Sequence, residues 1–179
     1  MQASHSTLSI SKNMSDLLFK LAPHQIQPIR TSFLQKVRAT AQDDLGQAVE
    51  YHIAKGGEPC RDVLRRAKAG EKLILASYCP FSIAGPYKEY GPIFVLAEDH
   101  QETPDLDPLS CSATIADSCY LQAQFVLRAY SEQERIVDAC VSSPEKAEGD
   151  LARLFSRPEV AFILIRFAAY GCYAARINR

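Results

Sequence analysis

The sequence predicts an α+β fold, with a mainly antiparallel sheet of about seven strands and two or three helices. Short apolar runs bounded by turn residues outnumber the stretches with helical periodicity. Several consecutive runs are joined by short polar turns, which are typical of antiparallel hairpins. The regular strand and helix alternation of a doubly wound parallel sheet is missing. We expect residues 1–13, which are polar and rich in serine, to form a disordered leader, and residues 14–179 to form a single domain.

The first helix is expected from Ser32 to Leu45. Ser32 and Gln35 match a capping box at its start, and Gly46 supplies a stop. Residues 47–54 then alternate between apolar and polar side chains, with Val49, Tyr51 and Ile53 on one side. This period of two predicts a half-buried strand.

Two continuous apolar runs in the middle of the chain predict strands that are buried on both faces. They cover Lys72 to Tyr78 and Pro92 to Ala97. Between them lies a loop, Cys79 to Gly91, that is rich in proline, glycine and tyrosine. The segment from Asp62 to Gly70 is ambiguous between a short helix and a strand. A second loop, from about Asp99 to Cys119, is long for a compact domain.

The C-terminal half is predicted to contain a hairpin, a helix and a second hairpin. Residues 124–130 and 135–141 flank a polar turn and form the first hairpin. Ser143 followed by Pro144 predicts a helix start, and the helix buries the stripe Ala147, Leu151, Leu154 and Phe155.

The second hairpin consists of Val160 to Phe167 and Gly171 to Ile177. Symmetric pairing would place Arg166 near Tyr173 and away from Arg176, which predicts a cation–π contact between Arg166 and Tyr173. The apolar strand Val160 to Phe167 also supports a non-catalytic hypothesis. At an exposed sheet edge it would pair with a second copy of the chain and make the protein a homodimeric interaction module.

Composition excludes several classes of function. The net charge is −1, so the chain lacks the positive charge that nucleic-acid binding requires. No apolar stretch is long enough for a membrane span, and no secretory signal is visible, so we expect a cytoplasmic protein without a membrane partner. The six cysteines lack the spacing of a disulfide framework, and most are expected to be free, buried thiols.

Several short motifs together resemble the bacterial family known as domain of unknown function 1203. They are PCR at 59–61, the strand LILASY, PY at 86–87, GPIF at 91–94, RAY at 128–130, IVDA at 136–139 and GCYAARI at 171–177. The resemblance covers roughly Met14 to Arg179 without the loop after Glu98. It implies a domain but no activity, because the family is functionally uncharacterised. A His-x-His-Asn run of family members is replaced here by Leu164, Arg166 and Phe167.

One enzymatic hypothesis concerns Cys60 as a nucleophile. Arg61 is adjacent, and cations lower the pKa of a thiol and so favour the reactive thiolate. His52 would be the base if the Gly56–Gly57 turn brought the two strands together. Buried structural cysteines are nevertheless more common than catalytic ones. A metal site is less favoured, because the cysteines and histidines lack ligand spacing, and no cofactor motif is present.

The preferred hypothesis is a pocket for a small anionic or carbonyl-bearing ligand. Arginines and tyrosines flank the loop Cys79 to Gly91, which is expected to close over the pocket. Many such side chains simply pair with carboxylates or stack on one another. The predicted ligand-binding residues are Arg61, Tyr78, Tyr87, Arg128, Arg166 and Tyr173.

Overall fold

The computed structural model describes residues 25–100, 102–105, 109 and 119–179. This part of the chain is α+β, with two helices and ten strands in two five-stranded sheets. The α+β class is therefore confirmed, but the expected single sheet of about seven strands is replaced by two sheets. Three of the ten strands are only two residues long, which is too short to produce a detectable sequence period. The predicted leader lies outside the described residues.

The sheet that contains β9 is antiparallel throughout, and we call it the β9 sheet. Both predicted hairpins belong to it. In one, Leu127 pairs with Cys140, and in the other Arg166 pairs with Tyr173 as expected. In order across the sheet its strands are β1 (Ile26–Gln27), β10 (Tyr173–Asn178), β9 (Phe162–Phe167), β7 (Phe125–Tyr130) and β8 (Ile136–Ser142).

The position of β9 contradicts the edge-strand route to a homodimer. β9 pairs with β10 on one side and with β7 on the other, and all six of its residues are buried. Its backbone groups are therefore already hydrogen-bonded within the chain, and none is left to pair with a second copy. The continuous apolar run predicted burial correctly, but such a run is typical of a central strand rather than an edge.

The second sheet, which we call the β5 sheet, is mixed, because β3 and β6 run parallel. Its strand β5, which lies between β2 and β6, has the predicted bounds. Its edge strand β2 is exposed along its whole length, and Tyr51 and Ile53 are each 63% exposed, so the expectation of a half-buried strand is wrong. In order across the sheet the strands are β2 (Glu50–Ile53), β5 (Lys72–Tyr78), β6 (Gly91–Leu96), β3 (Pro59–Cys60) and β4 (Arg65–Arg66).

The first helix, α1 (Thr31–Thr40), is shorter than predicted. It ends at Ala41, which adopts the left-handed conformation with φ 54° that was expected of Gly46. No side-chain hydrogen bond caps its start, so the expected capping box of Ser32 and Gln35 is absent.

The second helix, α2 (Ala147–Phe155), begins four residues after the predicted cap. The Ser143 hydroxyl donates to the Glu145 carboxylate (2.7 Å) instead of capping the helix, and the main chain from Ser143 to Lys146 forms a turn. The predicted stripe is correct, because the buried residues of α2 are Ala147, Leu151, Leu154 and Phe155.

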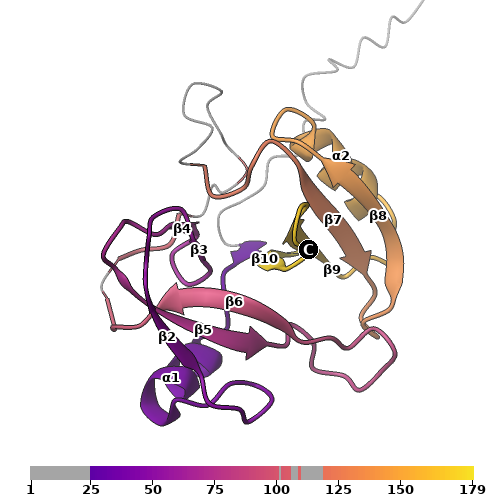
Figure 1. Cartoon of the computed structure of the whole chain (residues 1–179). Coiled ribbons are helices and arrows are strands. Elements are labelled where there is room, and N and C mark those ends of the chain that lie inside the picture. Colours follow the sequence, from indigo (N-terminus) through magenta and orange to yellow (C-terminus); the bar gives the residue numbers. More distant parts are fainter. Residues whose placement is uncertain (1–24, 101, 106–108, 110–118) are drawn as a thin grey trace, which may run out of the picture.

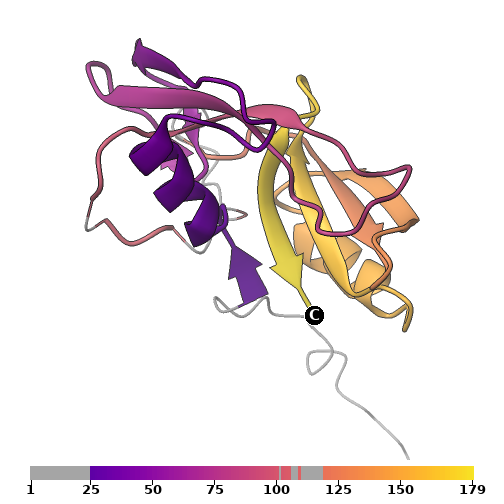
Figure 2. The same ribbon diagram turned by 90° about the horizontal axis from the view of Figure 1, so that it is seen from below.

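The two sheets pack against each other, and the core lies on the two faces of the β9 sheet (Figures 1 and 2). α2 packs on one face of the β9 sheet, where Leu151 and Leu154 join Leu127 in one cluster. The opposite face of the β9 sheet meets α1 and the β5 sheet, and Leu164 and Tyr173 join Phe33, Ile74 and Tyr78 there. We call this second face the inner face. Neither helix in the described part of the chain has the length and apolar character that a membrane crossing needs.

Candidate functional site

Three arginines lie on the inner face of the β9 sheet. Arg128 on β7 and Arg176 on β10 both pair with Leu164 of β9, and Arg166 lies two residues further along β9. Because side chains alternate along a strand, Arg166 shares a face with Leu164 and with both flanking arginines. The predicted contact between Arg166 and Tyr173 is not among the cation–π contacts of the described residues. In this hairpin Arg176 lies over the Phe162 ring instead, with its Cζ 3.6 Å from the ring centre.

Arg166 is 5% exposed and incompletely hydrogen-bonded. Its Nη1 donates to the Gly171 carbonyl oxygen (2.8 Å), and its Nη2 contacts the Glu89 carboxylate. Its Nε is buried without a partner among the described residues. Burial lowers the pKa of Arg166. The Glu89 carboxylate also lies 3.7 Å from Arg128 Nη1, so this one carboxylate contacts both arginines.

Arg61 is buried behind this site and lacks a carboxylate partner in the described part of the chain. It donates to the carbonyl oxygens of Tyr173 (2.9 Å) and Pro59 (2.5 Å), and its Nη2 lies 3.1 Å from Cys172 Sγ. Arg61 and Arg66 lie over the Phe167 ring, with their Cζ atoms 5.0 Å and 5.2 Å from its centre. Burial lowers the pKa of Arg66, and the nearby Arg61 charge adds to this effect.

Two tyrosines join the sheets beside these arginines. The rings of Tyr78 on β5 and Tyr173 on β10 lie 5.0 Å apart. The Tyr173 hydroxyl donates to the Pro28 carbonyl oxygen (3.0 Å), and the Tyr78 hydroxyl accepts from Arg30 Nε (3.3 Å). Burial raises the pKa of both phenols, so both hydroxyls stay neutral near pH 7.

A hollow of about 190 Å³ opens against these side chains, and we call it the Arg166 hollow. It is smaller than the pockets that hold drug-sized ligands. Its polar lining is Tyr78, Glu89, Tyr90, Arg166, Tyr170, Cys172 and Tyr173. A smaller hollow of about 120 Å³ shares Tyr78 and Tyr173 with it and contains Arg30 and Arg176.

The structure brings together most of the predicted ligand-binding residues. Tyr78, Arg166 and Tyr173 line the Arg166 hollow. Arg61 contacts the backbone of Tyr173 from behind, and Arg128 reaches the site through Glu89. Tyr87 does not line the hollow. It is 41% exposed, and the Arg135 guanidinium lies over its ring, with the Arg135 Cζ 5.9 Å from the centre of the Tyr87 ring.

The predicted pair of Cys60 and His52 is not brought together. β2, which carries His52, is separated from β3 by β5 and β6, and three strand spacings amount to about 14 Å. His52 is exposed, and its Nε2 lies 3.1 Å from the Glu50 carboxylate. Cys60 is fully buried, and burial, with the nearby Asp62 charge, raises its pKa to about 12. The low thiol pKa that the hypothesis requires is absent.

Sequence reasoning did not assign Glu89 or Arg176 to this site. Arg176 lies opposite Leu164 only because the register shifts between Tyr173 and Ala175. Unbroken pairing from Arg166 and Tyr173 would place Arg176 opposite Ile163, on the other face, so the sequence pattern does not predict its position. Glu89 belongs to an irregular loop, and no period indicates where its side chain points.

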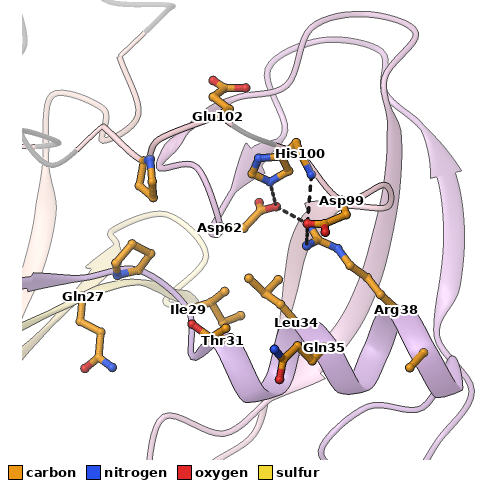
Figure 3. Close-up of a pocket in the computed structure, with 13 residues that line it drawn as sticks. Gln27, Ile29, Thr31, Leu34, Gln35, Arg38, Asp62, Asp99, His100 and Glu102 are labelled. Carbon is orange, nitrogen blue, oxygen red and sulfur yellow. Dashed lines mark hydrogen bonds and ion pairs between the residues drawn. The ribbon is translucent and has the colours of Figure 1, made fainter.

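A larger groove of about 810 Å³ runs between α1 and the segment after β6 (Figure 3). At its base the buried Asp62 carboxylate accepts from Arg38 Nη2 (3.0 Å) and lies 2.9 Å from His100 Nε2. The Leu96 backbone N–H donates to the same carboxylate (3.2 Å). Nδ1 of His100 has no partner among the described residues, but each charged group at this base is paired with a group of opposite charge. We therefore prefer the Arg166 hollow, where positive charge is in excess.

The fold and the site define an α+β protein of two packed sheets with an arginine-rich hollow on the inner face. The family model described as "Protein of unknown function (DUF1203)" matches residues 57–179, so the chain belongs to this family. The predicted resemblance is thus confirmed, and the match includes the whole lining of the Arg166 hollow. No curated protein and no solved structure matches the chain.

Proposed function

We propose that this protein binds a small anionic ligand, such as a carboxylate that also carries a carbonyl group, in the Arg166 hollow. One observation carries the proposal: the buried Arg166 keeps an Nε–H without a described partner at the wall of a hollow. A buried guanidinium is stable only when it is paired and hydrogen-bonded. An anion in the hollow would supply the missing acceptor.

The charge balance around the hollow supports an anionic ligand. Arg61, Arg66 and Arg166 are all close to Cys172 in its wall, whereas Glu89 is the one acidic residue of the lining. Guanidinium groups also bind carboxylates in a planar, two-pronged geometry, which favours a carboxylate over a spherical ion.

Glu89 is positioned as an internal substitute for the ligand. Its side chain is partly exposed and belongs to the loop between β5 and β6, yet its carboxylate contacts Arg166 and Arg128. An incoming carboxylate would take its place at Arg166 while Glu89 turned toward solvent. The cytoplasmic location expected from the sequence remains a prediction.

The proposal is tested by calorimetric titration of acetate, pyruvate and phosphate into the protein at low chloride. Arg166→Gln is expected to weaken carboxylate binding about 10- to 100-fold, because a hydrogen bond to a charged group contributes about 1.5–3 kcal/mol. Glu89→Gln is expected to strengthen it, because the internal competitor loses its charge. Arg153→Gln on α2, beyond the opposite face of the sheet, is the matched control and should leave binding unchanged.

Far-UV circular dichroism and thermal unfolding of each variant establish that the fold is retained. Because Glu89 is partly exposed, Glu89→Gln is expected to fold even if Arg166→Gln does not. Binding that is equal in the wild type, Glu89→Gln and Arg153→Gln, or no binding of any of the three anions at millimolar concentration, would refute the proposal.

A further inference from the structure

Cys172 differs from the two buried free thiols, Cys60 and Cys79, in the direction of its hydrogen bond. Cys60 Sγ donates to the Glu58 carbonyl oxygen (3.9 Å), and Cys79 Sγ donates to the Phe81 carbonyl oxygen (3.4 Å). Both of these contacts require the proton of a neutral thiol. Cys172 Sγ instead accepts from Arg61 Nη2 at 3.1 Å, a contact that is strongest when the sulfur is a thiolate.

Arg61 also requires a counter-ion. It is 2% exposed, and its hydrogen bonds within the described residues go to two carbonyl oxygens and to Cys172 Sγ. Carbonyl oxygens solvate a guanidinium but cannot neutralise it. The sulfur of Cys172 is the one partner among the three that can carry negative charge, so pairing with a thiolate would remove the cost of a buried, unpaired cation.

The other charged groups that face Cys172 also favour a negative charge on its sulfur. Arg66, from the β3–β4 segment, and Arg166, on β9, both interact electrostatically with Cys172. Tyr120 also faces it, and burial raises the pKa of this phenol, so it carries no negative charge near pH 7. Glu89 is the acidic residue of the hollow, and its carboxylate is engaged by Arg166. Positive charge therefore dominates around this sulfur.

Cys172 is also accessible from the hollow. It is partly buried, follows β9 in the turn before β10, and lies in the wall beside Arg166, whose Nε has no described partner. Cys60 and Cys79 are buried and do not line this hollow. A free thiol and a guanidinium with an unpartnered Nε thus line one small hollow.

We propose that Cys172 is a nucleophilic thiolate, held by Arg61, that adds reversibly to the carbonyl carbon of a small oxo-carboxylate bound at Arg166. The choice of ligand rests on the function proposed above. The sulfur lone pair forms the new carbon–sulfur bond, and the π electrons of the carbonyl group move to its oxygen. That oxygen takes a proton from water, which leaves hydroxide to the solvent, and gives a hemithioacetal whose carboxylate stays at Arg166; reversal of these steps releases the ligand. No oxidant or reductant is required.

The test compares alkylation by iodoacetate and by its neutral analogue iodoacetamide, followed at each cysteine by peptide mass mapping between about pH 5 and pH 9. In both reactions the thiolate forms a carbon–sulfur bond while iodide leaves with the electrons of the carbon–iodine bond. Cys172 is expected to react about 10-fold faster than Cys140 at pH 7, because an ordinary thiol is only a few per cent thiolate there. Cys140 is a suitable internal reference, since it is also free and partly exposed, and burial raises its pKa.

Arg61→Met should reduce the rate at Cys172 toward that at Cys140, whereas Arg61→Lys should preserve part of it. If Arg61→Met does not fold, the pH dependence of Cys172 alkylation in the wild type still tests whether Cys172 is a thiolate. A rate at Cys172 that stays nearly constant down to about pH 6 supports the thiolate, and one that falls tenfold per pH unit, as for an ordinary thiol, overturns it. Glyoxylate, a small oxo-carboxylate, should slow the alkylation of Cys172 and leave Cys140 unaffected.

The two proposals fail in different ways. Fast alkylation of Cys172 by both reagents, without protection by glyoxylate and without calorimetric anion binding, would overturn the ligand and retain the thiolate. Calorimetric anion binding with slow alkylation of Cys172 would overturn the nucleophile and retain the binding site.

Discussion

Replacement of Glu134 by glutamine is expected to lower the free energy of unfolding by about 4 kcal/mol and to loosen the loop over the Arg166 hollow. Glu134 lies in the β7–β8 turn and is only 8% exposed. Its carboxylate accepts from the Ser82 N–H, the Ser82 hydroxyl and the Ile83 N–H, each at 2.8 Å. These three bonds attach the start of the loop between β5 and β6 to the β9 sheet.

The magnitude follows from what glutamine retains. Its single side-chain oxygen can still accept from Ser82, but its amide group would face the Ile83 N–H, a second donor. One bond to a charged acceptor is lost, which costs about 1.5–3 kcal/mol, and two become neutral, which costs about 1 kcal/mol each, so the sum is about 4 kcal/mol. For a chain of this size the melting temperature should fall by about 8–16 °C.

The assay is urea unfolding together with hydrogen exchange of the Ser82 and Ile83 amides. Glu132→Gln is the matched control, because Glu132 belongs to the same turn but is exposed. Glu134 has a positive φ of 56°, but glutamine has the same unbranched β-carbon, so backbone strain cancels in the comparison. Unfolding midpoints of the two variants that agree within about 0.5 kcal/mol, the range of ordinary surface substitutions, would refute this reasoning.

The difference in unfolding free energy between the wild type and Glu134→Gln should decrease as the pH falls into the acid range. Burial alone would raise the pKa of Glu134, but the hydrogen bonds from Ser82 and Ile83 outweigh it and hold the pKa below the ordinary 4.5. A lowered folded-state pKa means that the carboxylate stabilises the fold above the unfolded-state pKa and loses this effect as the pH falls through the folded-state pKa. The gap between the wild type and Glu134→Gln should therefore be constant near neutral pH and close in acid.

Two further substitutions test other parts of the structure by urea unfolding. Asp62→Ala should destabilise by about 3–5 kcal/mol, because it breaks a buried ion pair with Arg38. Asp99→Ala, whose side chain is 87% exposed at the same arginine, should stay within about 1 kcal/mol of the wild type. Leu151→Ala on the buried face of α2 should cost about 2–5 kcal/mol, and equal effects of Leu151→Ala and the exposed Arg153→Ala would contradict the assigned packing of α2.

The elements that were predicted well are those whose pattern is local and long enough to have a period. β5 and the β7–β8 and β9–β10 hairpins occur where the apolar runs place them, and the buried stripe of α2 consists of the predicted residues. β3 and β4 show no such pattern, since two residues cannot establish a period. β2 has the right alternation but the wrong burial, because burial depends on whether another layer covers the strand, and no described segment covers β2.

The sequence by itself determined the α+β class, the family, the main hairpins and the concentration of arginine and tyrosine around the loop between β5 and β6. Only the tertiary structure decided which cysteine Arg61 contacts. Arg61 follows Cys60 in the chain, but consecutive side chains of an extended segment point to opposite sides, so its guanidinium turns away from Cys60. It reaches Cys172 instead, which is 111 residues away in the sequence and is brought to it by the packing of the two sheets.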